Sequence, residues 1–179
     1  GSLDEVATEK GALVEAVPPE GAVVLNADDA RVLGMRARSR ARVLTVSARE
    51  PADVRAVDAV EEAGGGLAVA LEIAGARATV RLAFAGRHNV VNALCAAGVG
   101  HALGLPLAAI VAGLETARPV KGRCVWRQAG GVRILDDTYN ANPASVRAAL
   151  DVLGSARGRK LAALGDMLEL GDHAPRLHA

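Results

Sequence analysis

The last third of the chain alternates between strand and helix patterns, and this alternation constrains the fold more than any other feature. Residues 131–137 (GVRILDD) form a predicted strand, residues 143–153 a predicted helix, and residues 160–165 (KLAALG) a second predicted strand. Two strands joined by a helix pair in the same direction, because the helix supplies the long crossover that a parallel pair needs. We therefore predict an α/β fold in which this segment begins a parallel sheet.

The residues before this segment predict a mixture of strands and helices. Four further strands are predicted, at residues 22–26, 42–47, 67–73 and 78–84. The last two form a predicted hairpin, and predicted apolar helices follow at residues 89–103 and 107–117. Residues 119–122 (PVKG) form a predicted linker. We therefore expect two parts, residues 1–119 and 120–179, of which the second is incomplete because one strand–helix–strand unit leaves its sheet uncovered.

Residues 88–114 contain no Asp, Glu, Lys or Arg and are long enough to cross a bilayer. However, the stretch contains Asn89, Asn92 and His101, and Gly104-Leu105-Pro106 divides it into two lengths that are typical of soluble helices. We expect no membrane span. The two cysteines, Cys95 and Cys124, are far apart and suggest no disulfide framework, so a reducing cytoplasm is the expected location.

Composition argues against a nucleic-acid partner. The net charge is +1, and the 179 residues include one Phe, one Trp and one Tyr, too few for a surface that stacks bases. Four arginines between residues 36 and 42 alternate with a period of two, which is typical of the solvent face of a strand. We therefore expect no nucleic-acid binding.

A polar run, DDTYNANP at residues 136–143, follows the predicted strand at residues 131–137. Open α/β sheets bind ligands where their strands end. Asn142 fits the N-cap of the following helix and Pro143 its first position. Asp137 is placed to accept hydrogen bonds from a ribose or to hold a cation, and a capped, solvated turn is the alternative.

A second polar group opens the predicted helix at residues 89–103. His88 and Asn92 are four residues apart and Asn89 and Asn92 are three apart, so all three side chains can face one ligand. A carboxamide both donates and accepts hydrogen bonds, which suits the edge of a nucleobase. The alternative is that Asn89 caps the helix while His88 packs beside it.

Several other motifs are weak or missing. Lys10 by itself is typical of a solvated surface residue. His173 and His178 are five residues apart with no third ligand near them, so we predict no zinc site. Neither GxGxxG after a strand nor GxxxxGK[ST] occurs in the 179 residues, so this chain has no recognisable phosphate-binding loop.

Six segments together resemble the Mur ligase family, in the family's order along nearly the whole chain. They are the lysine segment ending at Lys10-Gly11, VLNADD (24–29), GRHNV (86–90) with NAL (92–94), GR (122–123), DDTYNANP (136–143) and LGDMLELG (164–171). The YNANP and GDMLELG runs are similar to those of members that add D-alanyl-D-alanine. The resemblance implies the latter part of a central ATPase domain, a mixed sheet with helices, followed by the first βαβ unit of a Rossmann-like C-terminal domain.

The resemblance also implies a function. Such a protein is an ATP-dependent amide ligase of peptidoglycan synthesis, which needs Mg²⁺ and joins D-alanyl-D-alanine to a UDP-N-acetylmuramoyl-tripeptide through an acyl phosphate. The implied catalytic and metal-binding residues are Lys10, as a carbamate, and His88. The implied ATP-binding residues are Asn89, Asn92, Arg123 and Asp137, and weaker substrate candidates are Tyr139, Asn140 and Asn142. A monomeric cytoplasmic enzyme is expected.

The resemblance covers part of the family's length. We expect the uridine-nucleotide domain, the phosphate-binding loop and a metal-binding glutamate to precede residue 1, and the rest of the C-terminal domain to follow residue 179. The chain alone is therefore expected not to use ATP. Two alternatives stay open: another amide ligase, such as a different Mur ligase or a folylpolyglutamate synthase, and a non-catalytic nucleotide-binding homologue.

Overall fold

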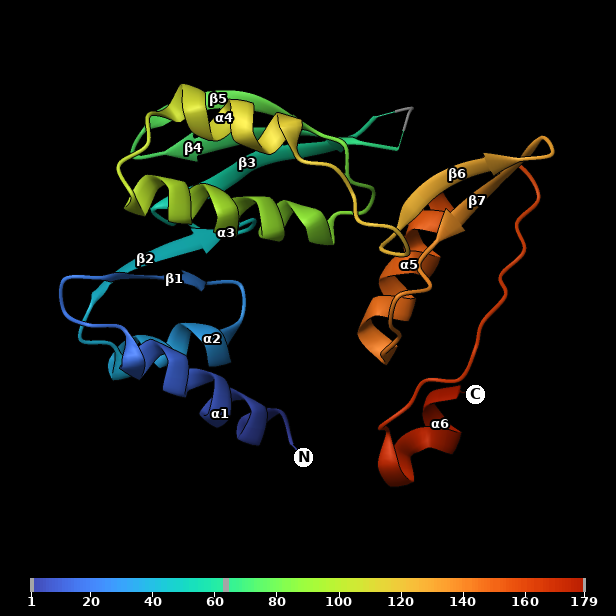
Figure 1. Ribbon diagram of the computed structural model, residues 1–179, viewed down its shortest axis with the longest axis horizontal. Coiled ribbons are helices and arrows are strands. Elements are labelled where there is room, and N and C mark those ends of the chain that lie inside the picture. The colour runs from blue at the N-terminus through green and yellow to red at the C-terminus, as the bar shows by residue number, and fades with distance from the viewer. Residues whose placement is uncertain (1, 63–64, 179) are drawn as a thin grey trace.

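The computed structural model describes residues 2–62 and 65–178, and its main feature is a five-stranded mixed sheet (Figure 1). Its strands, in sheet order, are β1 (Ala22–Asn26), β2 (Arg42–Ser47), β3 (Val54–Glu61), β4 (Leu67–Ile73) and β5 (Ala76–Leu82). β1, β2 and β3 pair in parallel, and β3, β4 and β5 pair antiparallel. The strands predicted at residues 22–26, 42–47 and 67–73 are confirmed with these bounds.

Helices cover both faces of the sheet at β1. Alternate residues of a strand point to opposite faces, and Val23 and Leu25 pack with Val14 of α1 (Leu3–Ala16). Val24, between them, packs into the core on the other face of the sheet, where α3 (His88–Ala102) and α4 (Leu107–Thr116) lie. α3 packs against β1 to β4, and α4 packs against β5 and α3. α1 and α3 are therefore on opposite sides of β1.

The principal core lies between α3 and the sheet. Its fully or almost fully buried members include Val46 of β2, Leu67 of β4 and Leu94 of α3. Gly98 allows α3 to approach closely, because a Cβ at this position would lie 2.8 Å from Cγ1 of Val24. The predicted helices at residues 89–103 and 107–117 are confirmed with ends that shift by one residue.

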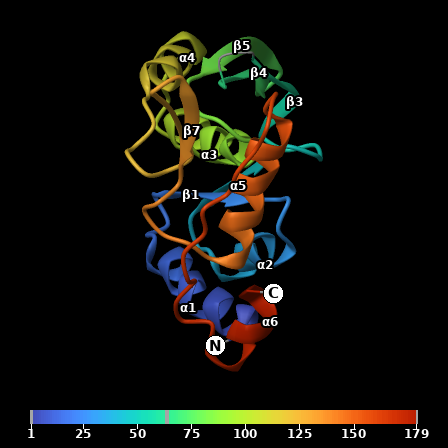
Figure 2. The same ribbon diagram turned by 90° about the vertical axis from the view of Figure 1, so that its right-hand side faces the viewer.

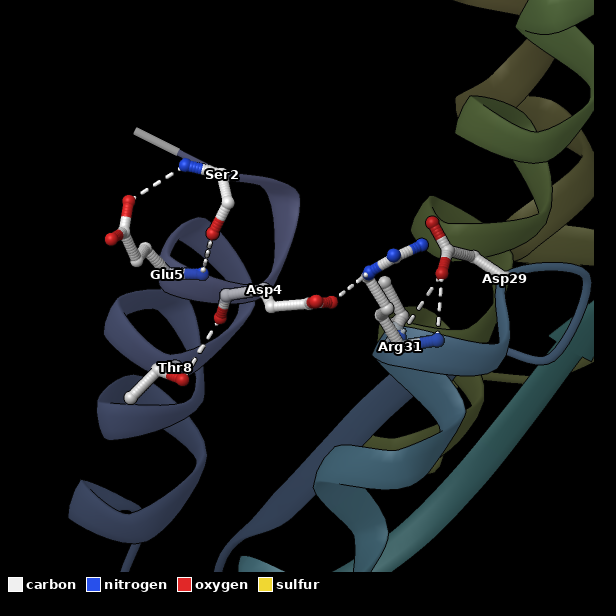
Figure 3. A network of polar contacts seen from close by, with 7 residues as sticks. Ser2, Asp4, Glu5, Thr8, Asp29 and Arg31 are labelled. Atoms are coloured by element: carbon white, nitrogen blue, oxygen red, sulfur yellow. Dashed lines mark hydrogen bonds and ion pairs between the residues drawn. The ribbon is translucent and has the colours of Figure 1, made fainter.

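α1 is held at its N-terminus by a polar network (Figure 3). The Ser2 hydroxyl accepts from the backbone N–H of Glu5, and the Glu5 carboxylate accepts from the backbone N–H of Ser2, which is a capping box. Asp4 Oδ1 lies 2.6 Å from Nε of Arg31, which belongs to α2 (Ala30–Gly34). α1 and α2 are thus joined by an ion pair at the surface.

The carboxyl ends of β1 and β2 are joined by side chains. Ser47 is fully buried, and its hydroxyl donates to Asp28 while accepting from the backbone N–H groups of Arg49 and Glu50. The second carboxylate oxygen of Asp28 accepts from the backbone N–H of Ala48. The VLNADD segment therefore closes the turn after β1 against the end of β2.

A smaller unit follows the sheet. β6 (Val125–Ala129) and β7 (Val132–Asp136) form an antiparallel hairpin, whose turn residues Gly130 and Gly131 both have positive φ. α5 (Pro143–Ser155) follows, capped by Asn142 as predicted, with its side chain accepting from the backbone N–H of Ser145. Figure 2 shows α5 and the long segment that leads from it to η2 (Gly171–His173) and α6 (Ala174–His178).

Two sequence predictions are wrong. Residues 160–165 form no strand: Leu161 and Leu164 are exposed and, together with Ile134 and Leu135 of β7, line an open cavity of about 750 Å³. Among the described residues β7 pairs with β6 alone, and its other edge carries no strand from residues 160–165.

The arginine alternation also has a different origin. Arg36 and Arg38 lie in η1 (Met35–Arg38), a 3₁₀ helix, and not on a strand. The Asp29 side chain accepts from the backbone N–H groups of Arg31 and Val32 and starts a helical segment here. Separately, no helix among the described residues has the length and apolar character needed to cross a membrane.

The ionised carboxylate of Asp53 stabilises the folded state. The pKa of Asp53 is lowered chiefly because the backbone N–H of Thr45 donates to its carboxylate at 2.7 Å. The Thr45 hydroxyl and the charge of Arg36 lower this pKa further, whereas partial burial of the carboxylate raises it. In the unfolded chain the Asp53 carboxylate takes up its proton at about pH 3.9. The stabilisation is therefore complete above that pH and is lost as the pH falls through the lower folded pKa.

We expect the unfolding free energy of the wild type to fall more steeply with acidification than that of Asp53→Asn. Urea denaturation from about pH 6 to about pH 3 measures both slopes. Equal slopes for the two proteins would contradict this role of Asp53.

Candidate functional site

Three polar side chains at the start of α3 form a connected group. Asn92 Nδ2 lies 2.9 Å from Oδ1 of Asn89, and Asn89 Nδ2 lies 3.1 Å from Nε2 of His88. Asn89 Nδ2 also donates to the carbonyl oxygen of Ala85 at 2.8 Å. Asn89 is half-buried, whereas His88 and Asn92 are exposed. The three side chains thus meet on one face of the helix, as their spacing predicts.

The alternative role for Asn89 as helix cap is not observed. α3 begins at His88 and its N-cap position is Arg87, which makes no side-chain capping hydrogen bond. Asn89 instead reaches back to the carbonyl of Ala85, one turn before it.

Gly86 makes room for this group. Its φ of +87° is a conformation that residues with a side chain rarely adopt. A Cβ at Gly86 would lie 2.7 Å from Cε1 of His88 and 2.9 Å from Cγ2 of Val152 in α5. The glycine therefore lets the imidazole and α5 pack against the same point of the backbone.

The second polar group joins the linker to the DDTYNANP loop. The backbone N–H of Cys124 donates to Oδ1 of Asp137 at 2.9 Å, and the backbone N–H of Tyr139 donates to the carbonyl of Gly122 at 2.9 Å. The Arg123 guanidinium lies 4.0 Å from the centre of the Tyr139 ring, a cation–π contact. Arg123 is therefore a neighbour of Asp137 and Tyr139, although it is distant from both along the chain.

The two adjacent aspartates in this loop have different surroundings. Asp136 Oδ1 accepts from the Thr138 hydroxyl at 2.7 Å, and its Oδ2 lies 3.0 Å from Nε of Arg127. The Thr138 hydroxyl is the first cause that holds the pKa of Asp136 below its usual range. Among the described residues Asp137 accepts at Oδ1 and makes no hydrogen bond at Oδ2. Asp137 is thus the member of the pair with an oxygen left for a ligand.

A small apolar cluster joins the two polar groups. Ala85, Cys124 and Val152 are buried together, with Trp126 and Leu135 packed against them. Burial, with a smaller effect of the Asp137 charge, raises the pKa of the Cys124 thiol to about 11. Since Ala85 binds Asn89 and Cys124 binds Asp137, this cluster fixes the start of α3 beside the DDTYNANP loop.

The remaining predicted residues lie elsewhere or serve the local structure. Lys10 is exposed on α1, on the opposite side of β1 from α3, and within residues 2–62 and 65–178 its side chain makes no hydrogen bond or ion pair. Asn140 Oδ1 accepts from the backbone N–H of Ala141, and Asn142 caps α5. Tyr139 is 65% exposed beneath Arg123.

Residues with metal-binding side chains are scattered over residues 2–62 and 65–178 and do not form a cluster. The described residues contain no group of three or more His, Cys, Asp and Glu side chains placed to hold a metal ion. His178, one of the two histidines near the C-terminus, accepts at Nε2 from the backbone N–H of Met167. His88 Nε2 faces the Asn89 amide, and Mg²⁺ prefers oxygen ligands.

Sequence reasoning missed two contributors to the site. One is the carbonyl of Ala85, a backbone atom that carries no residue-type signal. The other is Gly122, whose φ is +75° and whose Cβ would lie 3.1 Å from the backbone nitrogen of Tyr139. A glycine directly before Arg123 was the available signal for a close approach.

Two family profiles match the chain. The profile described as "Mur ligase middle domain" matches residues 1–100, and the profile "Mur ligase, glutamate ligase domain" matches residues 122–179. The linker around residue 120 lies between the two matched ranges.

Individual proteins agree with the profiles. The UDP-N-acetylmuramoyl-tripeptide–D-alanyl-D-alanine ligase of Mycobacterium bovis is 40% identical over 186 residues, which covers 99% of this chain and 36% of the relative. The protein of the same name from Escherichia coli is 43% identical over 93 residues, or 51% of this chain and 21% of the relative. The chain thus spans little more than a third of the mycobacterial relative.

A solved structure matches the whole fold. MurF from Acinetobacter baumannii superposes with a TM-score of 0.92 at 34% sequence identity, covering 99% of this chain and 39% of that chain. The match includes the mixed sheet and the smaller unit with α5. The middle-domain profile matches more than half of this chain, and the chain therefore belongs to the Mur ligase family.

Proposed function

We propose that the chain forms the adenosine-binding side of the catalytic centre of an ATP-dependent amide ligase, which joins D-alanyl-D-alanine to a UDP-N-acetylmuramoyl-tripeptide. The observation that carries this proposal is the junction at Ala85 and Cys124, which holds the His88–Asn89–Asn92 group beside Arg123 and Asp137. Amides suit a base edge, a free carboxylate oxygen suits ribose hydroxyls, and a guanidinium suits phosphate.

Each residue has a proposed task that its chemistry supports. Asn92 and Asn89 lie at the adenine, Asp137 Oδ2 accepts from the ribose, and Arg123, held over Tyr139, neutralises phosphate charge. Tyr139 and Asn140 stay weaker candidates for substrate contact, and Asn142 serves chiefly as the cap of α5. In such a ligase the peptide carboxylate takes the γ-phosphoryl group of ATP, and the dipeptide amine then displaces phosphate.

The proposed site also includes a divalent cation, for which Lys10 is the proposed ligand. As a carbamate, its side chain would offer the hard oxygens that Mg²⁺ prefers, and Lys10 is exposed and free of ion pairs among the described residues. Mg²⁺ would withdraw charge from the phosphates. His88 fits a place near the phosphates better than a place as metal ligand, since its Nε2 faces Asn89.

The proposal includes the organisation of the whole protein. We propose a central domain at residues 1–119 and a C-terminal domain at residues 120–179, a division supported by the gap between the two profile matches. We infer a monomeric enzyme of the cytoplasm, the compartment that supplies ATP.

Asp137→Asn tests the nucleotide site with little disturbance of the fold. The carboxamide oxygen of the variant still accepts from the Cys124 N–H, but an amide donor replaces the oxygen proposed for the ribose. We expect the dissociation constant for ADP, measured by NMR titration of the chain, to rise about tenfold. Asp151→Asn, an exposed change on α5, is the control and should leave ADP binding unchanged. Equal ADP affinity in wild type and Asp137→Asn would contradict the proposed site.

A chimera tests the reaction. Residues 1–179 replace the aligned segment of the Mycobacterium bovis ligase, and phosphate release is measured with and without each substrate. We expect release that requires both the UDP-linked tripeptide and D-alanyl-D-alanine. A folded chimera that prefers glutamate would favour the other amide ligases, and one that binds ADP without turnover would favour a non-catalytic homologue.

A further inference from the structure

The single tryptophan of the chain packs against a turn of the five-stranded sheet. Trp126 belongs to β6, in the smaller unit, and Gly65 lies between β3 and β4. We propose that this contact is a clamp that fixes the orientation of the smaller unit, so that Trp126 and Gly65 act as positioning residues for the nucleotide site. The inference rests on the proposed function and adds the contact that keeps the two halves of the site together.

Gly65 lets the turn and the indole approach closely. Its φ is +88°, and a Cβ at this position would lie 2.6 Å from Cδ1 and 3.0 Å from Nε1 of Trp126. The backbone N–H of Gly65 donates to the carbonyl of Glu62, and the N–H of Glu62 donates to the carbonyl of Gly66, both at 2.9 Å. The indole is half-buried, and the Arg133 guanidinium lies 4.3 Å from the centre of its ring. The indole can therefore keep this place only while residue 65 has no side chain.

The strand that leads into this turn is also joined to the start of α3. Arg87, at the N-cap position of α3, donates from its guanidinium to the carbonyl of Ala59 at 3.0 Å. Ala59 belongs to β3, two residues before the strand ends at Glu61. The part of the sheet that contacts Trp126 is therefore linked directly to the residue that precedes His88.

Trp126 is linked just as closely to the other half of the site. It pairs with Leu135 across the β6–β7 hairpin, and Leu135 is two residues before Asp137. Cys124, two residues before Trp126, donates from its backbone N–H to Oδ1 of Asp137. Because ladder hydrogen bonds keep β6 and β7 in register, a displacement of Trp126 also displaces Asp137.

Two separate contacts fix the orientation of the hairpin, whereas a single contact would leave it free to turn. The first is the buried cluster of Ala85, Cys124 and Val152, and the second is the clamp between Trp126 and Gly65. A nucleotide that binds both halves of the site needs this orientation. By linkage, the clamp favours nucleotide binding by the same free energy by which the nucleotide stabilises the clamp. ADP should therefore shield Trp126 without contacting it.

Two variants break the clamp from opposite sides. Gly65→Ala places a methyl group where the indole lies, whereas Trp126→Leu removes the indole and keeps an apolar side chain for the buried cluster. Gly75→Ala is the matched control, because Gly75 also has a positive φ in a hairpin turn and no described atom lies within 4 Å of its added Cβ. The double variant Gly65→Ala/Trp126→Leu tests whether both residues act through the same contact.

Tryptophan fluorescence reports the clamp directly, because Trp126 is the one tryptophan of the chain. In Gly65→Ala we expect emission at longer wavelength and faster quenching by acrylamide than in the wild type, and in the wild type saturating ADP should slow the quenching. The dissociation constant for ADP, from NMR titration, should rise about fivefold in Gly65→Ala and in Trp126→Leu, and no further in the double variant. Gly75→Ala should have the quenching and the ADP affinity of the wild type.

Different failures have different meanings. Wild-type quenching in Gly65→Ala, quenching that bound ADP leaves unchanged, or a loss of ADP affinity in the double variant equal to the product of the two single losses would overturn the clamp while leaving ADP binding intact. Thermal unfolding shows which variants are folded, and Trp126→Leu decides the effect on ADP affinity if Gly65→Ala does not fold. Absence of ADP binding to the wild type would overturn the proposed function, and the quenching of Gly65→Ala would still decide whether Trp126 packs on Gly65.

Discussion

Replacing Gly86 by alanine is expected to lower the unfolding free energy by about 3 kcal/mol. Two costs add at this position. The residue must hold a φ of +87°, and the new methyl group would lie 2.7 Å from His88 Cε1 and 2.9 Å from Val152 Cγ2. Relief would need the imidazole or α5 to move, and either movement disturbs the junction that holds the two polar groups together.

Gly75→Ala is the matched control. Gly75 has a similar φ of +81°, in the turn between β4 and β5, but no atom lies within 4 Å of its added Cβ. This variant should show the backbone strain alone, about 1 kcal/mol. Urea denaturation of both variants gives the difference, which measures the steric cost at Gly86. Equal destabilisation of the two would contradict close packing of His88 and α5 on Gly86.

Leu94→Ala is expected to be the most destabilising truncation, by about 3 to 4 kcal/mol. Leu94 is 1% exposed and lies in the core between α3 and the sheet. Alanine would leave a void among side chains that belong to several strands, and these cannot all collapse into it. The start of α3 would be less firmly placed, so ADP binding should weaken as well.

Leu103→Ala gives the comparison for this change. Leu103 follows the last residue of α3 and is 74% exposed, so the same atoms are removed from a solvated place. Its unfolding free energy should change by less than about 0.5 kcal/mol. If chemical denaturation showed a loss below about 1 kcal/mol for Leu94→Ala, the principal core would not lie where the structure puts it.

The amino-acid sequence determined the local features of the protein. Asn142 and Pro143 start α5 through a cap and a preset φ, which depend on neighbouring residues alone. Apolar runs located β1, β2, β4 and the two core helices, because their apolar residues recur with the period of the element that they form. Helical spacing likewise brought His88, Asn89 and Asn92 together.

Strand patterns were less informative where strands are partly exposed. β3 (Val54–Glu61) and β6 (Val125–Ala129) were not predicted, and most of their residues are exposed or half-buried. The apolar run at residues 160–165 was predicted as a strand and forms none. A strand needs a neighbouring backbone within hydrogen-bonding distance, and a run of apolar residues cannot supply that by itself.

The tertiary structure alone decided how the site is assembled. The Ala85–Cys124–Val152 cluster places the start of α3 beside Asp137, although residues 89 and 137 are far apart along the chain. The tertiary structure also places α1, which carries Lys10, on the opposite face of β1 from α3. The orientation of Asn89 depends on the backbone carbonyl of Ala85, to which its Nδ2 donates. Every residue type has a carbonyl, so its position comes from the packed fold and not from the sequence.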